Sequence, residues 1–445
     1  MRRLLMRSPI AVALFWIGAY LLVTLLPLLI LLIYPPPGGR GFWIEFSVAL
    51  GFIGLAMMAL QFVITARINR IEASYGIDIL LQFHRFTSLV AFFMVLVHPV
   101  MLFVVQPETR QLLNFIEAPW RARMAVLGTL AFILLVVTTI WRKPLGIPYE
   151  PWRTSHTILS VLAVGLGVGH AIGVGNYLGL FWKGILWGAM ALIALWLIIY
   201  VRLIKPWMMT KKPYLVEAVI PQRGDVWTLA LRPWGHEGFC FQPGQFAWLT
   251  LDITPFSMRE HPFSMSSSGE HPERIEFGIK ALGDFTSTIK EVPPGTKAYL
   301  DGPYGVFTID RYQDAAGFVL IAGGIGITPM MSMLVTAAER KDDRPFLLIY
   351  ASKTWDDITY REELEKLEER LDLTLIHVLR EPPEEWTGEQ GYVDKELLTR
   401  HIPKHRGSRQ YFICAAPKMM NQVERALHDL DVPVTNVHME HFNLA

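Results

Sequence analysis

The sequence predicts a multidomain membrane protein with three parts in order: a six-helix transmembrane bundle, an antiparallel β-barrel and a doubly wound α/β domain. Three observations predict it. Apolar residues are concentrated in the first 204 of the 445 positions. Short alternating strands separated by Gly and Pro follow between 214 and 310. From 316 onward, apolar strands alternate with helices. We place the domain boundaries at 1–208, 209–310 and 311–445.

Six runs in the first part are long and apolar enough to span a bilayer, whose hydrocarbon core is about 30 Å thick. They lie near 9–34, 43–66, 80–105, 123–142, 154–174 and 180–204. The basic N-terminus before the first run could also belong to a signal peptide. That run is too long, however, and no small-residue cleavage site follows it, so we expect a retained first helix.

Lys and Arg are divided unevenly between the two sides of these spans. One side carries Arg2, Arg3, Arg7, Arg67, Arg70, Arg142, Lys143, Arg153, Arg202, Lys205, Lys211 and Lys212, and the other carries Arg40, Arg110, Arg121, Arg123 and Lys183. The richer side is expected to be cytoplasmic. We therefore predict a multi-pass protein of the inner (plasma) membrane with both termini and the whole soluble half in the cytoplasm. A structural disulfide between Cys240 and Cys414 is not expected there.

Four histidines form two pairs with the same spacing. His84 and His98 are fourteen positions apart, and so are His156 and His170. Fourteen steps bring a helical side chain back to within about 40° of its starting direction and climb about 21 Å. The two helices are the third and fifth, so they run parallel, and His84 pairs with His156 on the inner side while His98 pairs with His170 on the outer side. Two bis-histidine sites stacked across a bilayer suit two b-type haems, although a single histidine in an apolar helix is more often a packed, hydrogen-bonded residue.

Residues beside these histidines have two interpretations each. Gly165, Gly167 and Gly169 precede His170. They would let a planar macrocycle approach the backbone, or they would serve helix–helix packing. Arg85 follows His84 and would meet a haem propionate or extend to the inner headgroups.

The last part contains a strand, a glycine turn and a helix in succession. Phe318–Ala322 reads as a buried strand, Gly323-Gly-Ile-Gly-Ile-Thr-Pro329 as the turn, and Met330–Arg340 as the helix. This arrangement presents backbone N–H groups to a pyrophosphate. A glycine turn alone is also common as a tight connection. The net charge of +1 offers no argument for a nucleic-acid partner.

At these residues the chain resembles the NADPH oxidase and ferric reductase superfamily, and its bacterial NADPH oxidase-like members in particular. The resemblance covers the chain from about residue 45 to the end. It is carried by the two histidine pairs, His261-Pro-Phe-Ser264, Asp301-Gly-Pro-Tyr-Gly305 and Gly323 to Pro329, which occur in the family's order. It implies a ferric-reductase-type membrane domain joined to a ferredoxin-reductase-type module with an FAD-binding β-barrel and an NAD(P)-binding α/β domain.

The resemblance implies a flavin site at His261, Pro262, Phe263 and Ser264. His261 would approach the FAD pyrophosphate, Phe263 would lie against the isoalloxazine, and the Ser264 hydroxyl would hydrogen-bond the ring edge near its redox nitrogen. Without the family, Phe263 could equally be a barrel core residue and Ser264 a turn residue. The family's second phosphate-binding motif matches this sequence at Gly278, Ile279, Lys280 and Thr286.

The resemblance also implies a nucleotide site, matched at Gly323, Gly324, Gly326, Thr328 and Pro329, with Cys414 and Pro417 near the nicotinamide. Ser352 and Lys353 follow the next strand, where the family meets the adenosine ribose. A hydroxyl and a cation there, assisted by Arg361, suit a 2′-phosphate, and the acidic residue typical of NAD selection is absent. We therefore expect NADPH, although Lys353 could also be a solvated loop cation.

The sequence departs from the family's pattern at two places. Cys414-Ala-Ala-Pro417 stands where the family commonly has Cys-Gly-x-Pro, so Ala415 would narrow the nicotinamide slot. Phe442 fits the aromatic that covers the flavin in many relatives, but three residues follow it. Phe442 therefore either covers the flavin or merely ends a strand.

The resemblance implies that electrons pass from cytoplasmic NADPH through FAD and two b-type haems to an acceptor on the outer side. Bis-histidine ligation leaves haem iron no open position, so the acceptor would react at the haem edge. The expected acceptor is oxygen, giving superoxide, and a ferric chelate is the alternative. A different class of function is an electron-donating membrane subunit, with the outer loop at 106–122 receiving a periplasmic partner protein.

Overall fold

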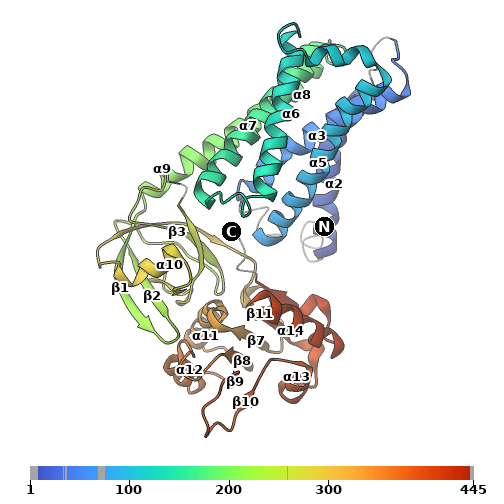
Figure 1. The fold of residues 1–445 in the computed structure, drawn as a ribbon. Coiled ribbons are helices and arrows are strands. Elements are labelled where there is room, and N and C mark those ends of the chain that lie inside the picture. The colour runs from blue at the N-terminus through green and yellow to red at the C-terminus, as the bar shows by residue number, and fades with distance from the viewer. Residues whose placement is uncertain (1–8, 34, 36–37, 69–75, 258, 441–445) are drawn as a thin grey trace. The chain divides into compact units, whose positions relative to one another are not determined.

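The structure, a computed structural model, describes residues 9–33, 35, 38–68, 76–257 and 259–440 (Figure 1). By its internal contacts the chain divides into two compact units. The first comprises residues 1–75 and 79–205, and the second comprises residues 76–78 and 206–445. Each unit is built around hydrophobic cores of its own.

The first unit confirms the six predicted apolar helices, with ends that differ by a few residues from the predicted runs. Within the described residues the six are α2 (Pro9–Ile33), α3 (Phe42–Thr65), α5 (Ile77–Val105), α6 (Trp120–Ile140), α7 (Tyr149–Val174) and α8 (Phe181–Ile199). All six are long and apolar enough to cross a membrane. The last candidate span continues through η2 (Tyr200–Ile204) and α9 (Lys205–Thr210), and so ends at Thr210. A short 3₁₀ helix, η1 (Pro107–Leu113), follows α5.

Glycines allow α3, α6 and α7 to approach their neighbours closely. A Cβ atom on Gly54 of α3 would lie 2.8 Å from the side chain of Val95 on α5. A Cβ atom on Gly167 of α7 would lie 2.8 Å from Leu55 on α3, and one on Gly169 would lie 2.1 Å from Met124 on α6. Gly167 and Gly169 therefore serve helix packing here. Gly165 differs, because a Cβ atom there would meet nothing within 4 Å.

The second unit begins with a curled antiparallel sheet of six strands. The strands are β1 (Tyr214–Gln222), β2 (Val226–Pro233), β3 (Phe246–Leu251), β4 (His261–Ser264), β5 (Ile275–Lys280) and β6 (Lys297–Tyr304), in the order β4-β3-β6-β1-β2-β5. An isolated bridge between Met265 and Phe277 brings the chain just after β4 onto β5, so the two ends of the sheet meet. Side chains such as Leu229, Leu249 and Phe277 fill the interior. The predicted barrel is thus confirmed.

A parallel sheet follows, as the predicted doubly wound domain requires. Its strands are β7 (Phe318–Gly323), β8 (Phe346–Ser352), β9 (Leu373–Leu379), β10 (Glu389–Gln390), β11 (Gln410–Cys414) and β12 (Val437–Met439), in the order β10-β9-β8-β7-β11-β12. The chain moves outward from β7 to β10 and then returns to the other side of β7. The switch point therefore lies between β7 and β11, where ligands of such sheets bind.

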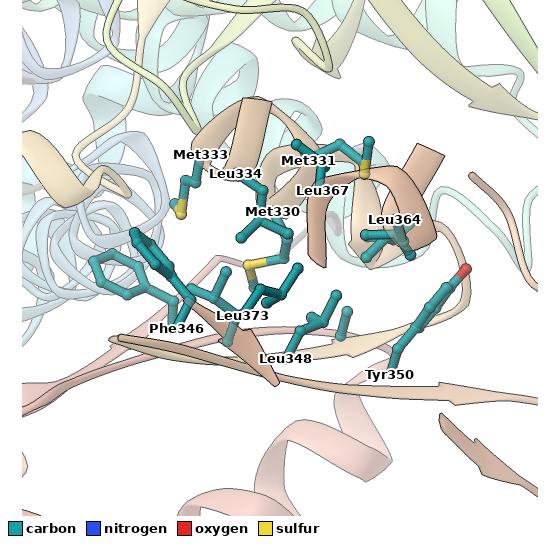
Figure 2. Close-up of a cluster of buried hydrophobic side chains, with 14 of the residues drawn as sticks. Met330, Met331, Met333, Leu334, Phe346, Leu348, Tyr350, Leu364, Leu367 and Leu373 are labelled. Carbon is teal, nitrogen blue, oxygen red and sulfur yellow. The ribbon is translucent and has the colours of Figure 1, made fainter. Parts of the chain in front are cut away.

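Helices cover both faces of this sheet because its strands are apolar on both faces. On one face Leu348, Tyr350 and their neighbours pack under α11 (Ile327–Arg340) and α12 (Arg361–Glu368), as Figure 2 shows. On the other face residues such as Ile321 and Ile349 pack against α13 (Lys395–His401) and α14 (Pro417–Asp429). Continuous apolar strands of this kind are typical of parallel sheets.

Candidate cofactor sites

The four predicted haem ligands lie on α5 and α7, two on each helix. The rings of His84 and His156 are near each other, with centroids 6.4 Å apart and planes at 62°. An imidazole nitrogen lies about 1.1 Å from its ring centre and a metal–nitrogen bond is about 2 Å long, so two rings on one iron have centres about 6 Å apart. The spacing of this pair would therefore let both histidines hold the iron of one haem.

The outer pair is held by backbone carbonyl groups. The Nδ1 atom of His98 lies 2.9 Å from the carbonyl oxygen of Ser47, and the Nδ1 atom of His170 lies 3.0 Å from that of Arg121. A carbonyl oxygen only accepts, so each Nδ1 carries the proton and each Nε2 keeps a lone pair for a metal. The Ser47 hydroxyl also donates to the carbonyl oxygen of His98, at 2.8 Å, and its Oγ atom lies 3.0 Å from His98 Nδ1.

The inner pair is held by side chains instead. The Nδ1 atom of His84 lies 2.9 Å from Oε1 of Gln61, whose Nε2 donates to the Met57 carbonyl oxygen at 3.0 Å and to Thr87 Oγ1 at 3.1 Å. Because the amide nitrogen is engaged elsewhere, Oε1 accepts from His84.

Thr139 holds the second inner histidine in the same way. Its hydroxyl donates to the Leu135 carbonyl oxygen at 2.7 Å and lies 3.2 Å from the Nδ1 atom of His156. All four histidines are thus in the tautomer that leaves Nε2 to a metal, and these residues fit two haems. Periodicity did not identify the acceptors Gln61 and Thr139. Arg85 is exposed on α5, and both interpretations of it stay open.

The two predicted flavin-binding motifs meet at one aromatic side chain, Phe285. The His261 ring stacks on the Phe285 ring with centroids 3.9 Å apart, and the Phe263 ring lies 6.2 Å from it. Phe285 belongs to the short helix α10 (Asp284–Thr288) and lies within the second motif. The sequence pattern by itself gave Phe285 no role.

Ser264 provides the observation that tests the fit of FAD. It is 4% exposed, and its Oγ atom has no hydrogen-bond partner among the described residues. A buried hydroxyl without a partner costs about 1–3 kcal/mol, so a ligand atom at this place would remove a penalty. The flavin ring edge proposed by the resemblance has hydrogen-bonding atoms of this kind, and Ser264 therefore fits it.

The remaining residues of the second motif mainly make contacts within the protein. Thr286 Oγ1 accepts from the backbone N–H groups of Leu282 and Gly283, at 3.0 and 2.9 Å, and closes the turn before α10. Ile279 is buried in the barrel core. Lys280 ends β5 and is partly exposed.

Gly278 lies where the α/β domain contacts the barrel. A Cβ atom there would lie 2.4 Å from the hydroxyl of Tyr360 and 3.0 Å from Oγ1 of Thr328. The Tyr360 hydroxyl lies 3.3 Å from Thr228 Oγ1 on β2, and burial raises the pKa of Tyr360 to about 12. A neutral phenol therefore connects the barrel and the α/β domain. Close packing against Tyr360 explains the glycine at this position as well as a bound phosphate would.

The glycine turn lies at the switch point of the parallel sheet. Gly324, with φ of +55°, begins η5 (Gly324–Gly326), and α11 follows directly. A Cβ atom on Gly326 would lie 1.9 Å from the Cys414 carbonyl oxygen, and one on Gly323 would lie 2.8 Å from the Ala415 Cβ atom. The turn is thus pressed against the end of β11. The turn leads directly into a fourteen-residue helix, and a glycine turn followed by a helix N-terminus is the kind of position where a pyrophosphate binds.

The other residues predicted around the turn are placed as follows. The Thr328 hydroxyl donates to the Ile325 carbonyl oxygen at 2.9 Å, and Pro329 is buried in the first turn of α11. Cys414 is fully buried, and burial raises the pKa of its thiol well above the usual range. A neutral, buried thiol suits a packing role rather than that of a nucleophile. Pro417 begins α14 and is exposed.

The predicted 2′-phosphate site has a neighbour that the sequence did not indicate. Ser352 ends β8, and its buried Oγ atom has no partner among the described residues. The Lys353 ammonium lies 3.4 Å from the Glu381 carboxylate, and both side chains are more than half exposed. Glu381 follows β9, so only the parallel sheet brings it beside Lys353.

Arg361 is held differently from the expectation that it assists Lys353. Its guanidinium lies 4.6 Å from the centre of the Trp355 ring, and the side chain is 13% exposed. It also donates to the Trp355 carbonyl oxygen at 3.3 Å. Arg361 is therefore packed against Trp355. The predicted flavin cover, Phe442, lies outside the described residues.

Three family profiles match consecutive parts of the chain. A profile described as ferric reductase like transmembrane component matches residues 50–167. An FAD-binding domain profile matches residues 219–308, and an oxidoreductase NAD-binding domain profile matches residues 320–425. The three follow the order of the six-helix unit, the barrel and the parallel sheet.

Individual relatives match up to about half of the chain. NADH-cytochrome b5 reductase 1 of Debaryomyces hansenii is 35% identical over 153 residues, which are 33% of this chain and 54% of that protein. The reductase component of propane 2-monooxygenase of Mycolicibacterium smegmatis is 29% identical over 237 residues, 51% of this chain and 66% of that protein. The chain thus spans about half to two thirds of these relatives' lengths.

Solved structures also resemble this half of the chain. The cytochrome b5 reductase domain of Ulva prolifera nitrate reductase aligns with a TM-score of 0.46 and 18% identity, over 52% of this chain and 98% of that chain. A ferredoxin reductase of carbazole 1,9a-dioxygenase aligns with a TM-score of 0.46 and 22% identity, over 52% of this chain and 69% of that chain.

Proposed function

Because this chain has the domain architecture of the NADPH oxidase and ferric reductase superfamily, we propose that it is a transmembrane NADPH oxidoreductase. It takes electrons from NADPH in the cytoplasm and delivers them to oxygen on the outer side of the plasma membrane. One NADPH and two oxygen molecules give NADP⁺, one proton and two superoxide ions, so two electrons leave and two are received.

The state of the four histidines carries this proposal. Each Nδ1 is engaged by a neighbouring acceptor, and the spacing of the His84 and His156 rings would let both hold one iron. A structural histidine would have no need to leave Nε2 open. Two such pairs about 21 Å apart along parallel helices support a path for electrons across most of the hydrocarbon core.

The protein supplies binding and orientation, while FAD and the haems, when bound, supply hydride acceptance and one-electron transfer. The Gly324–Gly326 turn and the α11 N-terminus bind the NADPH pyrophosphate. Ser264 orients the flavin ring edge, and the stacked His261 and Phe285 rings line its site. Gln61 and Ser47 hold the haem ligands in one tautomer.

The proposed acceptor reaction needs no catalytic side chain. Two histidines on each iron would leave no open position for a substrate, so oxygen would react at the edge of the outer haem. A ferric chelate could react at the same edge. Our proposal of oxygen rests on the resemblance in sequence, and the experiment below compares both acceptors.

The test uses the full chain reconstituted in proteoliposomes. We expect two haems per chain, NADPH-dependent superoxide on the outer side, and slower turnover with a ferric chelate under nitrogen. His98→Leu should remove the outer haem and the superoxide while NADPH still reduces FAD. His428→Leu, at an exposed position of α14, is the matched control. Full haem content and full superoxide production by His98→Leu would refute the proposal, and faster turnover with the chelate would replace oxygen as the acceptor.

A further inference from the structure

The second unit carries an exposed basic and aromatic surface where the chain leaves the last candidate span. That span ends at Thr210, and Lys211 and Lys212 follow it immediately. Trp207, one turn earlier, is 56% exposed, and the Lys211 ammonium lies 5.5 Å from the centre of its ring. The next residue, Pro213, leads into β1.

The barrel itself extends this surface with residues distant in sequence. The backbone N–H of Trp234 donates to the Pro213 carbonyl oxygen at 2.9 Å, which places Trp234 beside the exit segment. The Trp234 side chain is 53% exposed, and the Lys297 ammonium lies 5.2 Å from the centre of its ring.

Strand register adds one more cation to the same face. Leu215 on β1 is the register partner of both Arg232 on β2 and Lys297 on β6. Paired residues of neighbouring strands point to the same side of a sheet. Tyr214 and Val216 on either side of Leu215 are buried, so Arg232, Leu215 and Lys297 form a row on the outer face of the barrel.

We define the exit surface as Trp207, Lys211, Lys212, Arg232, Trp234 and Lys297. Within the part of the chain that the structure describes, none of its four cations forms an ion pair with a carboxylate. Four uncompensated cations with two exposed tryptophans next to the end of a span match the chemistry of a bilayer surface. Tryptophan is enriched at headgroup depth, and clusters of Lys and Arg just outside a span attract anionic lipids.

We propose that the exit surface binds the headgroups of anionic phospholipids, and so fixes the barrel to the bilayer at a second point besides the covalent connection. The tryptophans enter the headgroup layer, and the cations meet lipid phosphates. The proposal needs only that the chain spans a bilayer. It is independent of the cofactors and of the electron acceptor.

The test is hydrogen–deuterium exchange of the full chain in nanodiscs of two compositions, phosphatidylcholine alone and an equal mixture with phosphatidylglycerol. We expect backbone exchange at residues 211–216, 232–236 and 295–299 to slow about fivefold in the anionic discs. High salt should reverse this protection, because screening weakens interactions between exposed charges.

Variants separate lipid binding from bulk charge. Arg232→Glu with Lys297→Glu should abolish the lipid-dependent protection. Lys366→Glu with Arg370→Glu changes the net charge equally at exposed positions in and just after α12, and should leave it intact. Equal exchange in both disc types, or protection insensitive to salt, would overturn the proposal and would indicate that protein rather than lipid covers the surface.

Discussion

At the scale of single residues, the two histidine pairs differ in what accepts their Nδ1 protons. Backbone carbonyl groups hold the outer pair, and the side chains of Gln61 and Thr139 hold the inner pair. A substitution cannot remove a carbonyl group, but it can remove a side chain. The donor strength of the inner histidines can therefore be changed by mutating their acceptor side chains. The carbonyl acceptors of the outer histidines belong to the helix backbones.

Gln61→Leu should raise the midpoint potential of the inner haem, on the order of tens of millivolts, because a histidine without an acceptor at Nδ1 is a weaker donor to ferric iron. Gln61→Glu should lower it, since a carboxylate is a stronger acceptor. A redox titration followed by visible absorption measures both. Thr138→Val removes a hydroxyl that bonds only to carbonyl oxygens of its own helix and is the control, with both potentials close to those of the natural protein. Unchanged potentials in both Gln61 variants would disprove the tuning role.

Lys353 and Glu381 should act in opposite directions on nucleotide preference. Lys353→Ala should raise the Michaelis constant for NADPH about fivefold, equivalent to about 1 kcal/mol for an exposed charge pair, and leave that for NADH nearly unchanged. Glu381→Gln should lower the constant for NADPH, because its carboxylate repels a 2′-phosphate. Steady-state kinetics with both nucleotides measures this, with Lys366→Ala as the control. Equal effects on NADPH and NADH would show that Lys353 does not recognise the phosphate.

At the scale of elements, helix α11 connects the glycine turn to the barrel loop that follows the His261–Ser264 motif. Its apolar face covers the parallel sheet (Figure 2). Its polar face binds the barrel loop: the Ser332 hydroxyl donates to the Ser267 carbonyl oxygen at 2.8 Å, and Thr336 Oγ1 accepts from the Gly269 N–H at 3.0 Å. At its end, the Arg340 guanidinium lies 2.7 Å from the Glu270 carboxylate. One helix therefore connects the glycine turn with this barrel loop.

Thr336→Val should destabilise the soluble half by about 1–2 kcal/mol, because it leaves the Gly269 N–H without its acceptor at a buried position. Thermal unfolding followed by flavin fluorescence should show earlier release of FAD. Thr399→Val is matched to it, since the Thr399 hydroxyl bonds only to its own helix at an exposed position. If the two variants melt alike, the contact between α11 and the loop contributes nothing measurable.

At the scale of the whole molecule, the two cysteines provide a natural report on orientation. Cys240 is exposed in the barrel, whereas Cys414 is buried with a raised thiol pKa. A thiol reagent should therefore modify only Cys240 in the folded protein. The distribution of Lys and Arg predicts that Cys240 lies on the cytoplasmic side.

A membrane-impermeant maleimide should label Cys240 in inside-out vesicles and not in intact cells, and Cys240→Ser should abolish the label. Arg110→Cys in the Cys240→Ser background introduces a thiol in η1, beyond the third span, and should show the reverse pattern. Labelling of the natural protein in intact cells would invert the proposed orientation, and with it the direction of electron flow.

The order of the parts and the positions of the histidines were predictable from the sequence by itself. Spans, strands and a glycine turn are set by composition and periodicity within a few dozen residues, and fourteen-residue spacing on a helix is a local property. The six spans, the barrel and the doubly wound sheet accordingly agree with their predictions.

Only the tertiary structure determined what surrounds each of these residues. Gln61 accepts from a histidine 23 positions later, Gly278 makes room for Tyr360, and Glu381 meets Lys353 across neighbouring strands. Such contacts join segments that no local period relates, and they depend on how helices pack and on strand order. For that reason the sequence predicted the ligands of the proposed haems, and only the fold showed which groups accept their Nδ1 protons.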